Sequence, residues 1–144
     1  MTDRTATVIW NGTLPDGEGT IESGSGALDG LPVTWASRVE APEGKTSPEE
    51  LLAASEAECY TMVLTNMLST QGNVPDEIRT TATCTVERQE SGLKITTMRL
   101  QVAGKVPGLD ADAFAQAAQE ANQKCPVSNA LRGNLDFSVE AQLD

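Results

Sequence analysis

The residues of this chain that could carry out nucleophilic or redox chemistry are its three cysteines, Cys59, Cys84 and Cys125. The chain has 144 residues and no histidine, which excludes a Ser-His-Asp or Cys-His relay, an HExxH zinc site and an imidazole general base. A thiol is a nucleophile at neutral pH only when its thiolate is stabilised. With no imidazolium available, we expect an arginine or a lysine to provide that stabilisation.

Each cysteine allows a structural and a chemical interpretation. Cys59 falls in the middle of a predicted amphipathic helix, where it is either a small core residue or a functional thiol in a helix contact. Cys125 directly precedes Pro126 at a predicted helix start, where the backbone amides favour a thiolate, and an ordinary helix terminus explains this position equally well. Cys84 follows the alternation of a strand, which predicts a buried core residue.

Arg38 stands out among the ten lysine and arginine residues as a partner for a thiolate. It follows a predicted strand and leads into the loop before a helix start. An arginine fork can hold a thiolate and also a carboxylate behind it. The alternative interpretation is a solvated surface arginine, and the residues alone leave both open.

Two glutamates occupy the first turn of the predicted helix that carries Cys59. Glu50 is explained as the reciprocal member of a capping box, whereas Glu49 has no such local role. A straight helix would place Glu49 about 15 Å from Cys59, because ten residues rise about 1.5 Å each. A shared site therefore needs a break in the helix, a bridge through Arg38 or a carboxylate from another subunit.

Composition and charge exclude several classes of protein. Ten basic and 21 acidic residues give a net charge of -11, which repels phosphate backbones, so we expect no nucleic-acid partner. Residues 1–7 do not resemble a secretory signal, and no apolar run is long enough to span a bilayer, so we expect no membrane association. An odd number of cysteines favours a reducing compartment and hence a cytoplasmic location. Aromatic residues make up only 3% of the chain, which suggests a core shared with a second chain.

The first half of the chain predicts a meander of short strands followed by a long helix. Turn signals separate strands over residues 4–10, 19–23 and 31–37, and a loop covers 39–46. A capping box at Ser47-Pro48-Glu49-Glu50 starts a helix over 48–70 that ends at Gly72. The stripe predicted to face the core consists of Leu52, Ser55, Cys59, Met62, Val63, Asn66 and Met67.

The second half predicts two strands, a helix and a final strand. The strands cover 77–88 and 93–103, and apolar residues change parity within the second one, which indicates a bulge or burial on both faces. Asp110 is the expected N-cap of an alanine-rich helix, and a short turn over 127–132 precedes a strand over 135–141. No repeat or linker interrupts the pattern. We therefore expect a single α+β domain over residues 1–144.

Two blocks of sequence together resemble the OsmC/Ohr (organic hydroperoxide resistance) family of thiol peroxidases. The first is Ser47-Pro48-Glu49-Glu50-Leu51-Leu52-Ala53-Ala54 followed by Cys59 and Met62, and the second is Cys125-Pro126-Val127-Ser128 with Leu131. Pro107-Gly108-Leu109-Asp110 lies between them. The resemblance covers essentially the whole chain. An arginine just after the third predicted strand makes it look like the OsmC branch.

This resemblance implies an OsmC-like fold, with antiparallel sheets packed on long central helices in an intertwined homodimer. It implies that Cys59 attacks an organic hydroperoxide and that Cys125 then forms a disulfide with the resulting sulfenic acid. By matching position, Arg38 would stabilise the thiolate and Glu49 would pair with Arg38, while an external dithiol, lipoyl-type in the Ohr branch, would restore the thiols. Such chemistry requires no metal and no cofactor.

Some features depart from the family or leave its function open. Glu58 stands beside Cys59 where a small residue is usual, and we expect its side chain to face away from the site. Cys84 has no family role. The competing hypothesis is a non-catalytic protein of the same fold that binds a small hydrophobic ligand or acts in stress. An acidic interaction protein with incidental thiols is a third possibility.

Overall fold

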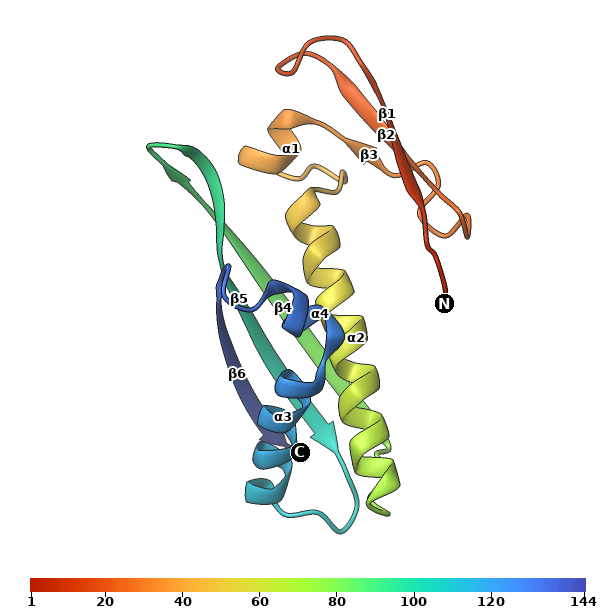
Figure 1. Cartoon of the computed structure of the whole chain (residues 1–144), viewed down its shortest axis with the longest axis vertical. Helices are drawn as coiled ribbons and strands as arrows, with labels where there is room; N and C mark the ends of the chain where they lie inside the picture. The colour runs from red at the N-terminus through yellow and green to blue at the C-terminus, as the bar shows by residue number, and fades with distance from the viewer. The chain divides into compact units, whose positions relative to one another are not determined.

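The computed structural model describes all 144 residues, and they form two compact units, Met1–Leu51 and Leu52–Asp144 (Figure 1). The single domain expected over residues 1–144 stays a prediction. Helix α2 (Pro48–Thr70) begins in the first unit and continues through the second without interruption. None of the helices combines the length and the apolar character that crossing a membrane requires.

The first unit contains the predicted meander. Strands β1 (Ala6–Asn11), β2 (Glu18–Ser23) and β3 (Pro32–Val33) form one antiparallel sheet in sequence order. Ile21 of β2 is buried, whereas Val8, Ile9 and Trp10 on β1 are exposed. Both faces of β1 therefore lack cover within this chain.

The prediction of a third strand over 31–37 is wrong beyond Val33, where β3 ends. Residues Trp35–Val39 form a short helix, α1, which includes Arg38. The cause is a local capping box that the sequence analysis did not identify. Thr34 Oγ1 accepts from the Ser37 amide at 3.0 Å, and Ser37 Oγ accepts from the Thr34 amide at 3.1 Å. These bonds satisfy amides that a strand would pair with a neighbour.

The start of α2 is confirmed, although the expected capping box forms only in part. Ser47 Oγ accepts from the Glu50 amide at 3.1 Å, as an N-cap should. The Glu50 carboxylate does not return a bond to Ser47, and it accepts instead from Thr46 Oγ1 at 3.0 Å. The helix is followed by Gly72, whose φ of 86° places it in the left-handed region.

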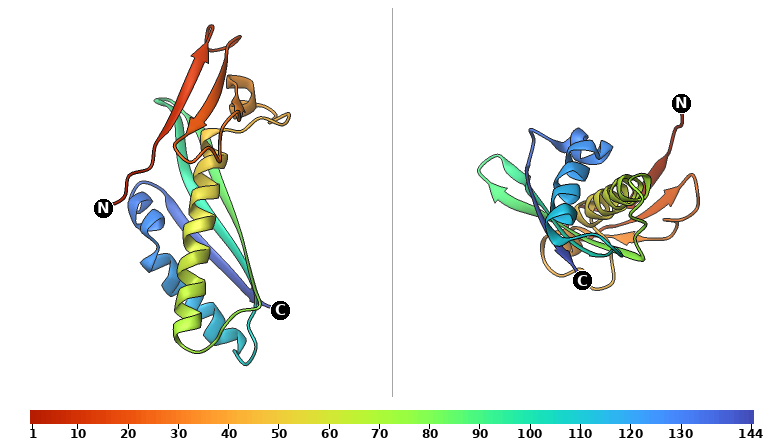
Figure 2. Two further views of the ribbon diagram at one scale, coloured as in Figure 1. Left: turned by 90° about the vertical axis from the view of Figure 1, so that its right-hand side faces the viewer. Right: turned by 90° about the horizontal axis from the view of Figure 1, so that it is seen from below.

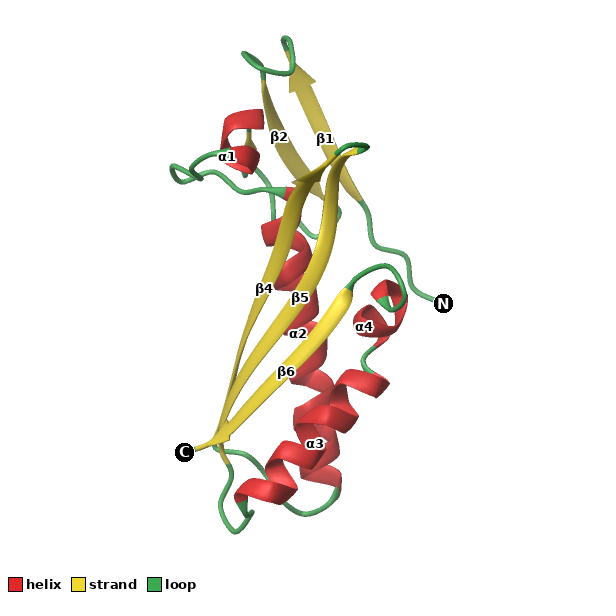
Figure 3. Cartoon of the chain, turned by 90° about the vertical axis from the view of Figure 1, so that its left-hand side faces the viewer, coloured by secondary structure: helices red, strands yellow, loops and turns green.

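The second unit is built on the sheet β4-β5-β6, with strands Glu77–Gln89, Gly92–Lys105 and Asp136–Leu143 (Figure 3). Strands β4 and β5 are antiparallel, but β6 runs parallel to β5, so this sheet is mixed where an antiparallel one was expected. The register shifts between Thr85 and Val86, where Thr96 on β5 is the extra residue. This irregularity confirms the predicted bulge and explains the parity change.

Two more helices complete the second unit. Asp110 caps α3 (Ala111–Lys124) by accepting from the Ala113 amide at 2.8 Å, as predicted. A short helix, α4 (Pro126–Leu131), follows directly. Figure 2 and Figure 3 show α2 and α3 on the same face of the sheet. The core between them contains Tyr60, Leu64, Leu68, Met98, Leu100, Phe114 and Ala121, all fully buried.

The buried stripe of α2 differs from the predicted one. Of the predicted residues, Ser55, Met62 and Asn66 are exposed, and Met62 is 62% exposed. The buried face is displaced around the helix axis and consists of Glu56, Tyr60, Leu64, Met67 and Leu68. Met67 of the predicted stripe is buried, and Leu52, Cys59 and Val63 are partly buried against the core, so the prediction is confirmed in part. It is wrong for the three exposed residues because apolar side chains occur on more than one face of α2, so spacing alone does not select the core face.

Candidate active site

The two candidate catalytic cysteines meet where α2 contacts the junction of α3 and α4. Cys125 ends α3 and caps α4, and Pro126, which cannot continue α3, turns the chain at this point. The Cys59 and Cys125 thiols interact through a side-chain hydrogen bond. Cys59 is partly exposed, whereas Cys125 is fully buried, and both are free thiols. One thiol is therefore open to a substrate, and the second lies behind it.

The surroundings of Cys59 raise its pKa. The largest cause is burial, which penalises the charged thiolate, and the hydrogen bond with Cys125 and the charge of Glu56 act in the same direction. A hydrogen bond from the Val127 backbone opposes this rise. None of these groups is a cation, so their combined influence favours the neutral thiol.

The backbone at the start of helix α4 interacts with the Cys59 thiol rather than with the Cys125 thiol. The sequence suggested that Cys125 would be stabilised by the amides at the start of this helix. Its side chain makes no capping hydrogen bond, and the Val127 amide interacts with the Cys59 thiol instead. The expected influence of the backbone on a thiol is present, but it acts on the other cysteine.

A buried carboxyl, Glu56, completes this cluster, although it was not among the residues predicted from the sequence. Its side chain is fully buried, and Oε1 accepts a hydrogen bond of 2.5 Å from Ser128 Oγ, which is fully buried as well. Burial is the largest influence on Glu56 and raises its pKa, whereas the hydrogen bond from Ser128, the nearby Cys125 thiol and the charge of Arg132 lower it. The sequence does contain a signal for its burial. Glu56, Tyr60 and Leu64 follow one another at intervals of four residues, which places the glutamate on the same face of α2 as two core residues.

The other two candidate residues, Arg38 and Glu49, form an ion pair within the first unit. Arg38 Nη2 donates to Glu49 Oε1 at 2.8 Å, and Nε donates to both carboxylate oxygens at 3.1 and 3.3 Å. The Glu49 side chain is only 7% exposed, against 31% for Arg38. The pairing suggested by the sequence thus occurs, with α1 carrying the arginine and α2 the glutamate.

The structure therefore places the four predicted residues in two pairs, Arg38 with Glu49 and Cys59 with Cys125. Because α2 is continuous, the break between Glu49 and Cys59 that was one of the three alternatives is excluded. Glu58, the acidic neighbour of Cys59, is exposed as predicted.

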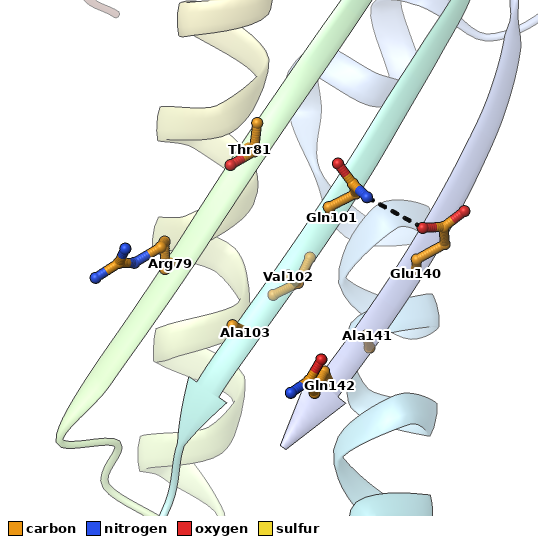
Figure 4. Close-up of a pocket in the computed structure, with 8 residues that line it drawn as sticks. All are labelled: Arg79, Thr81, Gln101, Val102, Ala103, Glu140, Ala141 and Gln142. Atoms are coloured by element: carbon orange, nitrogen blue, oxygen red, sulfur yellow. Dashed lines mark hydrogen bonds between the residues drawn. The ribbon is translucent and has the colours of Figure 1, made fainter. Parts of the chain in front are cut away.

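Cys84 and a depression on the sheet are two further features of the second unit. Cys84 is partly buried on the inward-facing side of β4, in agreement with its predicted strand position. A depression of about 410 Å³ lies on the outer face of the sheet, lined by residues of β4, β5 and β6 (Figure 4). Gln101 bonds Glu140 across it at 3.3 Å, and its lining contains no thiol. No three histidine, cysteine or acidic side chains are grouped to hold a metal ion.

Comparison with known proteins identifies relatives that match along most of the chain. Peroxiredoxin OsmC of Escherichia coli strain K12 is 37% identical over 134 residues, which cover 92% of this chain and 93% of that protein. The organic hydroperoxide resistance protein of Xanthomonas axonopodis pv. citri is 30% identical over 123 residues, covering 85% and 84%. The higher identity to the OsmC protein agrees with the branch that the sequence suggested.

The fold leads to the same relatives. The crystal structure of the organic hydroperoxide resistance protein OhrB of Bacillus subtilis superimposes with a TM-score of 0.75 at 28% identity, covering 96% of this chain and 98% of that one. The family model for OsmC-like proteins matches residues 41–140, a range that includes Glu49, both interacting cysteines and Glu56. The chain therefore belongs to the OsmC family, whose named relatives are peroxiredoxins and organic hydroperoxide resistance proteins.

Proposed function

We propose that this protein reduces organic hydroperoxides to alcohols with Cys59 as the attacking thiol. The Cys59 thiolate attacks the distal peroxide oxygen, the O–O bond breaks, and Cys59 becomes a sulfenic acid. The alkoxide takes up the proton that Cys59 released on ionisation and leaves as the alcohol. Cys125 then displaces the sulfenic hydroxyl as water and forms a disulfide with Cys59. An external dithiol, with a lipoyl-type compound as the candidate, reduces that disulfide.

The observation that carries this proposal is the contact between a partly exposed and a fully buried thiol. A disulfide needs its two sulfurs close together, and the interaction between the Cys59 and Cys125 thiols supports this pairing. The names of the relatives, peroxiredoxin and organic hydroperoxide resistance protein, support the same class of substrate. We include a cytoplasmic location, and no nucleic-acid or membrane partner, in the proposal.

We further propose a homodimer in which the Arg38–Glu49 pair of one subunit activates Cys59 of the other. The groups that shift the pKa of Cys59 within its own chain include no cation, although a thiolate needs one. Arg38 uses Nε and Nη2 for Glu49 and leaves Nη1 as a donor without a partner in this chain. Exposed apolar residues such as Trp10 on β1 and Met62 on α2 offer surfaces that a second copy would cover.

Mixed dimers test whether Arg38 acts across subunits. Neither Arg38→Ala nor Cys59→Ser homodimers contain a complete site. If the subunits exchange, a heterodimer of the two variants has one site with Cys59 from one chain and Arg38 from the other. We expect mixing in equal amounts to raise activity above the average of the two separate variants, by as much as a quarter of the wild-type level. Activity that stays at that average would contradict the cross-subunit arrangement.

Turnover tests the function itself. Reduced protein should consume an alkyl hydroperoxide such as cumene hydroperoxide in the presence of dihydrolipoamide, and Cys59→Ser should abolish this. Cys84→Ser is the matched control, because it removes a thiol outside the proposed pair, and it should retain turnover. Consumption that persists in Cys59→Ser would overturn the mechanism. Absence of consumption in the wild type would favour the alternative of a non-catalytic protein that binds a small hydrophobic ligand.

A further inference from the structure

Glu56 is a fully buried acid whose carboxyl group is only half satisfied. Oε1 accepts from Ser128, while Oε2 is buried and has no hydrogen bond of good geometry. Burial of a carboxyl with an unsatisfied oxygen destabilises a fold, and an apolar side chain of similar size would avoid that cost. A purely structural role, in which Glu56 links α2 to α4, explains the hydrogen bond of Oε1. It does not explain why Oε2 is buried without one.

The group within reach of this carboxyl is the thiol of Cys125. The Cys125 thiol is close enough to lower the pKa of Glu56 as a donor would. Oε2 has no hydrogen-bond partner, so it is free to accept the proton of this thiol. Glu56 also precedes Cys59 by three residues on α2, and residues at this spacing are neighbours on a helix surface. The carboxyl is thus close to both sulfurs of the proposed disulfide.

We propose that Glu56 is the general base that takes the proton of the Cys125 thiol and passes it to the hydroxyl that leaves Cys59. This assignment rests on the proposed function, because it concerns the second step of that reaction. It gives the buried thiol a route to its reactive form that needs neither histidine nor bulk water, since Cys125 is fully buried.

The step balances as an exchange within the site. Cys125 Sγ forms a bond to Cys59 Sγ, and the S–O bond of the sulfenic acid breaks with its electron pair staying on oxygen. The Cys125 sulfur is oxidised and the Cys59 sulfur is reduced. The proton moves from Cys125 to Glu56 and then to the departing oxygen, so water leaves and Glu56 returns to its ionised form. No further oxidant or reductant takes part.

Other groups around Glu56 set when it can accept a proton. Cys59 and Tyr60 approach it on α2, and Cys125 and Arg132 approach it from the α3–α4 region. Tyr60 has its pKa raised, first by burial, so it remains neutral and does not compete for the proton at neutral pH. The charge of Arg132 lowers the pKa of Glu56 and partly offsets burial. A carboxyl with a raised pKa lies closer to a thiol in proton affinity, which suits it to this transfer.

Single-turnover kinetics of the wild type and Glu56→Gln separate the two steps. Glutamine keeps the size of the side chain and an oxygen for Ser128, but it cannot take up a proton. We expect disulfide closure to slow by about 100-fold, which is typical of a lost general base, with the Cys59 sulfenic acid trapped by dimedone. The attack on peroxide should become equal or faster, because the charge of Glu56 raises the pKa of Cys59. Slowing of both steps, or of neither, would overturn the proposal.

Ser128→Ala is the matched control for the structural role. It removes the bond to Oε1 and leaves the carboxyl in place. We expect closure to slow less than about tenfold, because tenfold is the equivalent of about 1.4 kcal/mol, the upper end of what one hydrogen bond contributes. If Ser128→Ala slows closure as much as Glu56→Gln does, the carboxyl acts only as a tie between helices and the proposal is wrong.

The wild-type protein provides a readout that does not depend on how a variant folds. The rate of disulfide closure should rise with pH to a plateau as Glu56 loses its proton. A rate that instead climbs steadily with pH and reaches no plateau as Glu56 loses its proton would show that this carboxyl is not the base. Sulfenic acid that forms but closes unchanged in Glu56→Gln contradicts this inference alone. Failure of wild-type Cys59 to form sulfenic acid contradicts the proposed function as well.

Discussion

Arg38 and Glu49 form a bidentate ion pair in which the buried carboxylate holds the more exposed guanidinium, with Nη2 of Arg38 2.8 Å from Oε1 of Glu49. Glu49 gains from its place in the first turn of α2, where the helix dipole stabilises negative charge. The pair therefore fixes the orientation of Arg38 through a rigid element. A guanidinium held in this way can present its remaining donors to an anion without a further loss of side-chain freedom.

Removal of that guanidinium should slow the reaction of Cys59 with peroxide. An opposite charge lowers the pKa of a neighbouring group by about 1–3 units, and part of the lost thiolate is offset by greater nucleophilicity. We therefore expect Arg38→Ala to lower the second-order rate constant by about 3- to 30-fold at pH 7, with a pH–rate profile displaced to higher pH. Stopped-flow measurement with an alkyl hydroperoxide checks this.

Arg79→Ala is the control for general charge effects, because Arg79 pairs with Glu77 at the exposed edge of the second unit. It should leave the rate unchanged. An Arg38→Ala profile identical to that of the wild type would contradict the proposed role of the ion pair.

The raised pKa of Glu56 predicts a specific pH dependence of stability. The folded protein holds this proton more tightly than the unfolded chain, whose reference pKa is 4.5. The stabilisation is therefore fully present below that value and is lost as pH rises through the higher folded pKa. Glu56→Gln mimics the neutral acid at every pH. Its free energy of unfolding, relative to that of the wild type, should therefore increase as pH rises. Urea unfolding of both reduced proteins across this range measures the difference, and a constant difference would contradict it.

Gly104 on β5 lies against the ring of Phe114 on α3, and a substitution there tests how closely the two elements pack. A Cβ at this position on β5 would lie 2.5 Å from ring carbons of Phe114 on α3. We expect Gly104→Ala to lower the free energy of unfolding by about 1–3 kcal/mol, the usual cost of overpacking a core. The double variant Gly104→Ala with Phe114→Leu should recover part of that loss. Equal stability of Gly104→Ala and the wild type in urea would show that the two elements are not in close contact.

Substitution of Cys125 should separate the two halves of the proposed cycle. In Cys125→Ser, Cys59 can still react with peroxide, but no second thiol is available to close the disulfide. We expect the sulfenic acid to persist and to be oxidised further to sulfinic acid by excess peroxide, with loss of activity over successive turnovers. Mass spectrometry of the Cys59 peptide checks this. A Cys125→Ser protein that turns over like the wild type would remove Cys125 from the mechanism.

Local signals in the sequence predicted much of the fold. Ser47 and Pro48 located the start of α2, Asp110 located the start of α3, and the parity change before Met98 located the bulge in β5. These features depend on a few neighbouring residues. Helix α1 was missed although its signal is also local, because Thr34 and Ser37 form a capping box within a segment that otherwise resembles a strand.

The candidate site was harder to predict because it depends on which face of α2 is buried. Met62 and Glu56 lie on the same helix, yet Met62 is exposed and Glu56 is fully buried, in contrast to what hydrophobicity alone suggests. Partners from distant parts of the sequence, such as Ser128, make the burial of a carboxyl possible. The interaction of Cys59 with the Val127 amide likewise depends on how α4 packs on α2, which sequence spacing does not specify.

The most direct test of the central claim is to locate the disulfide formed by one equivalent of organic hydroperoxide. Fully reduced protein should be treated, alkylated and digested without reduction, and its cross-linked peptides identified by mass spectrometry. The account predicts an intramolecular Cys59–Cys125 disulfide with Cys84 still alkylated. Absence of that disulfide after complete consumption of the peroxide, or a disulfide that involves Cys84 instead, would contradict it.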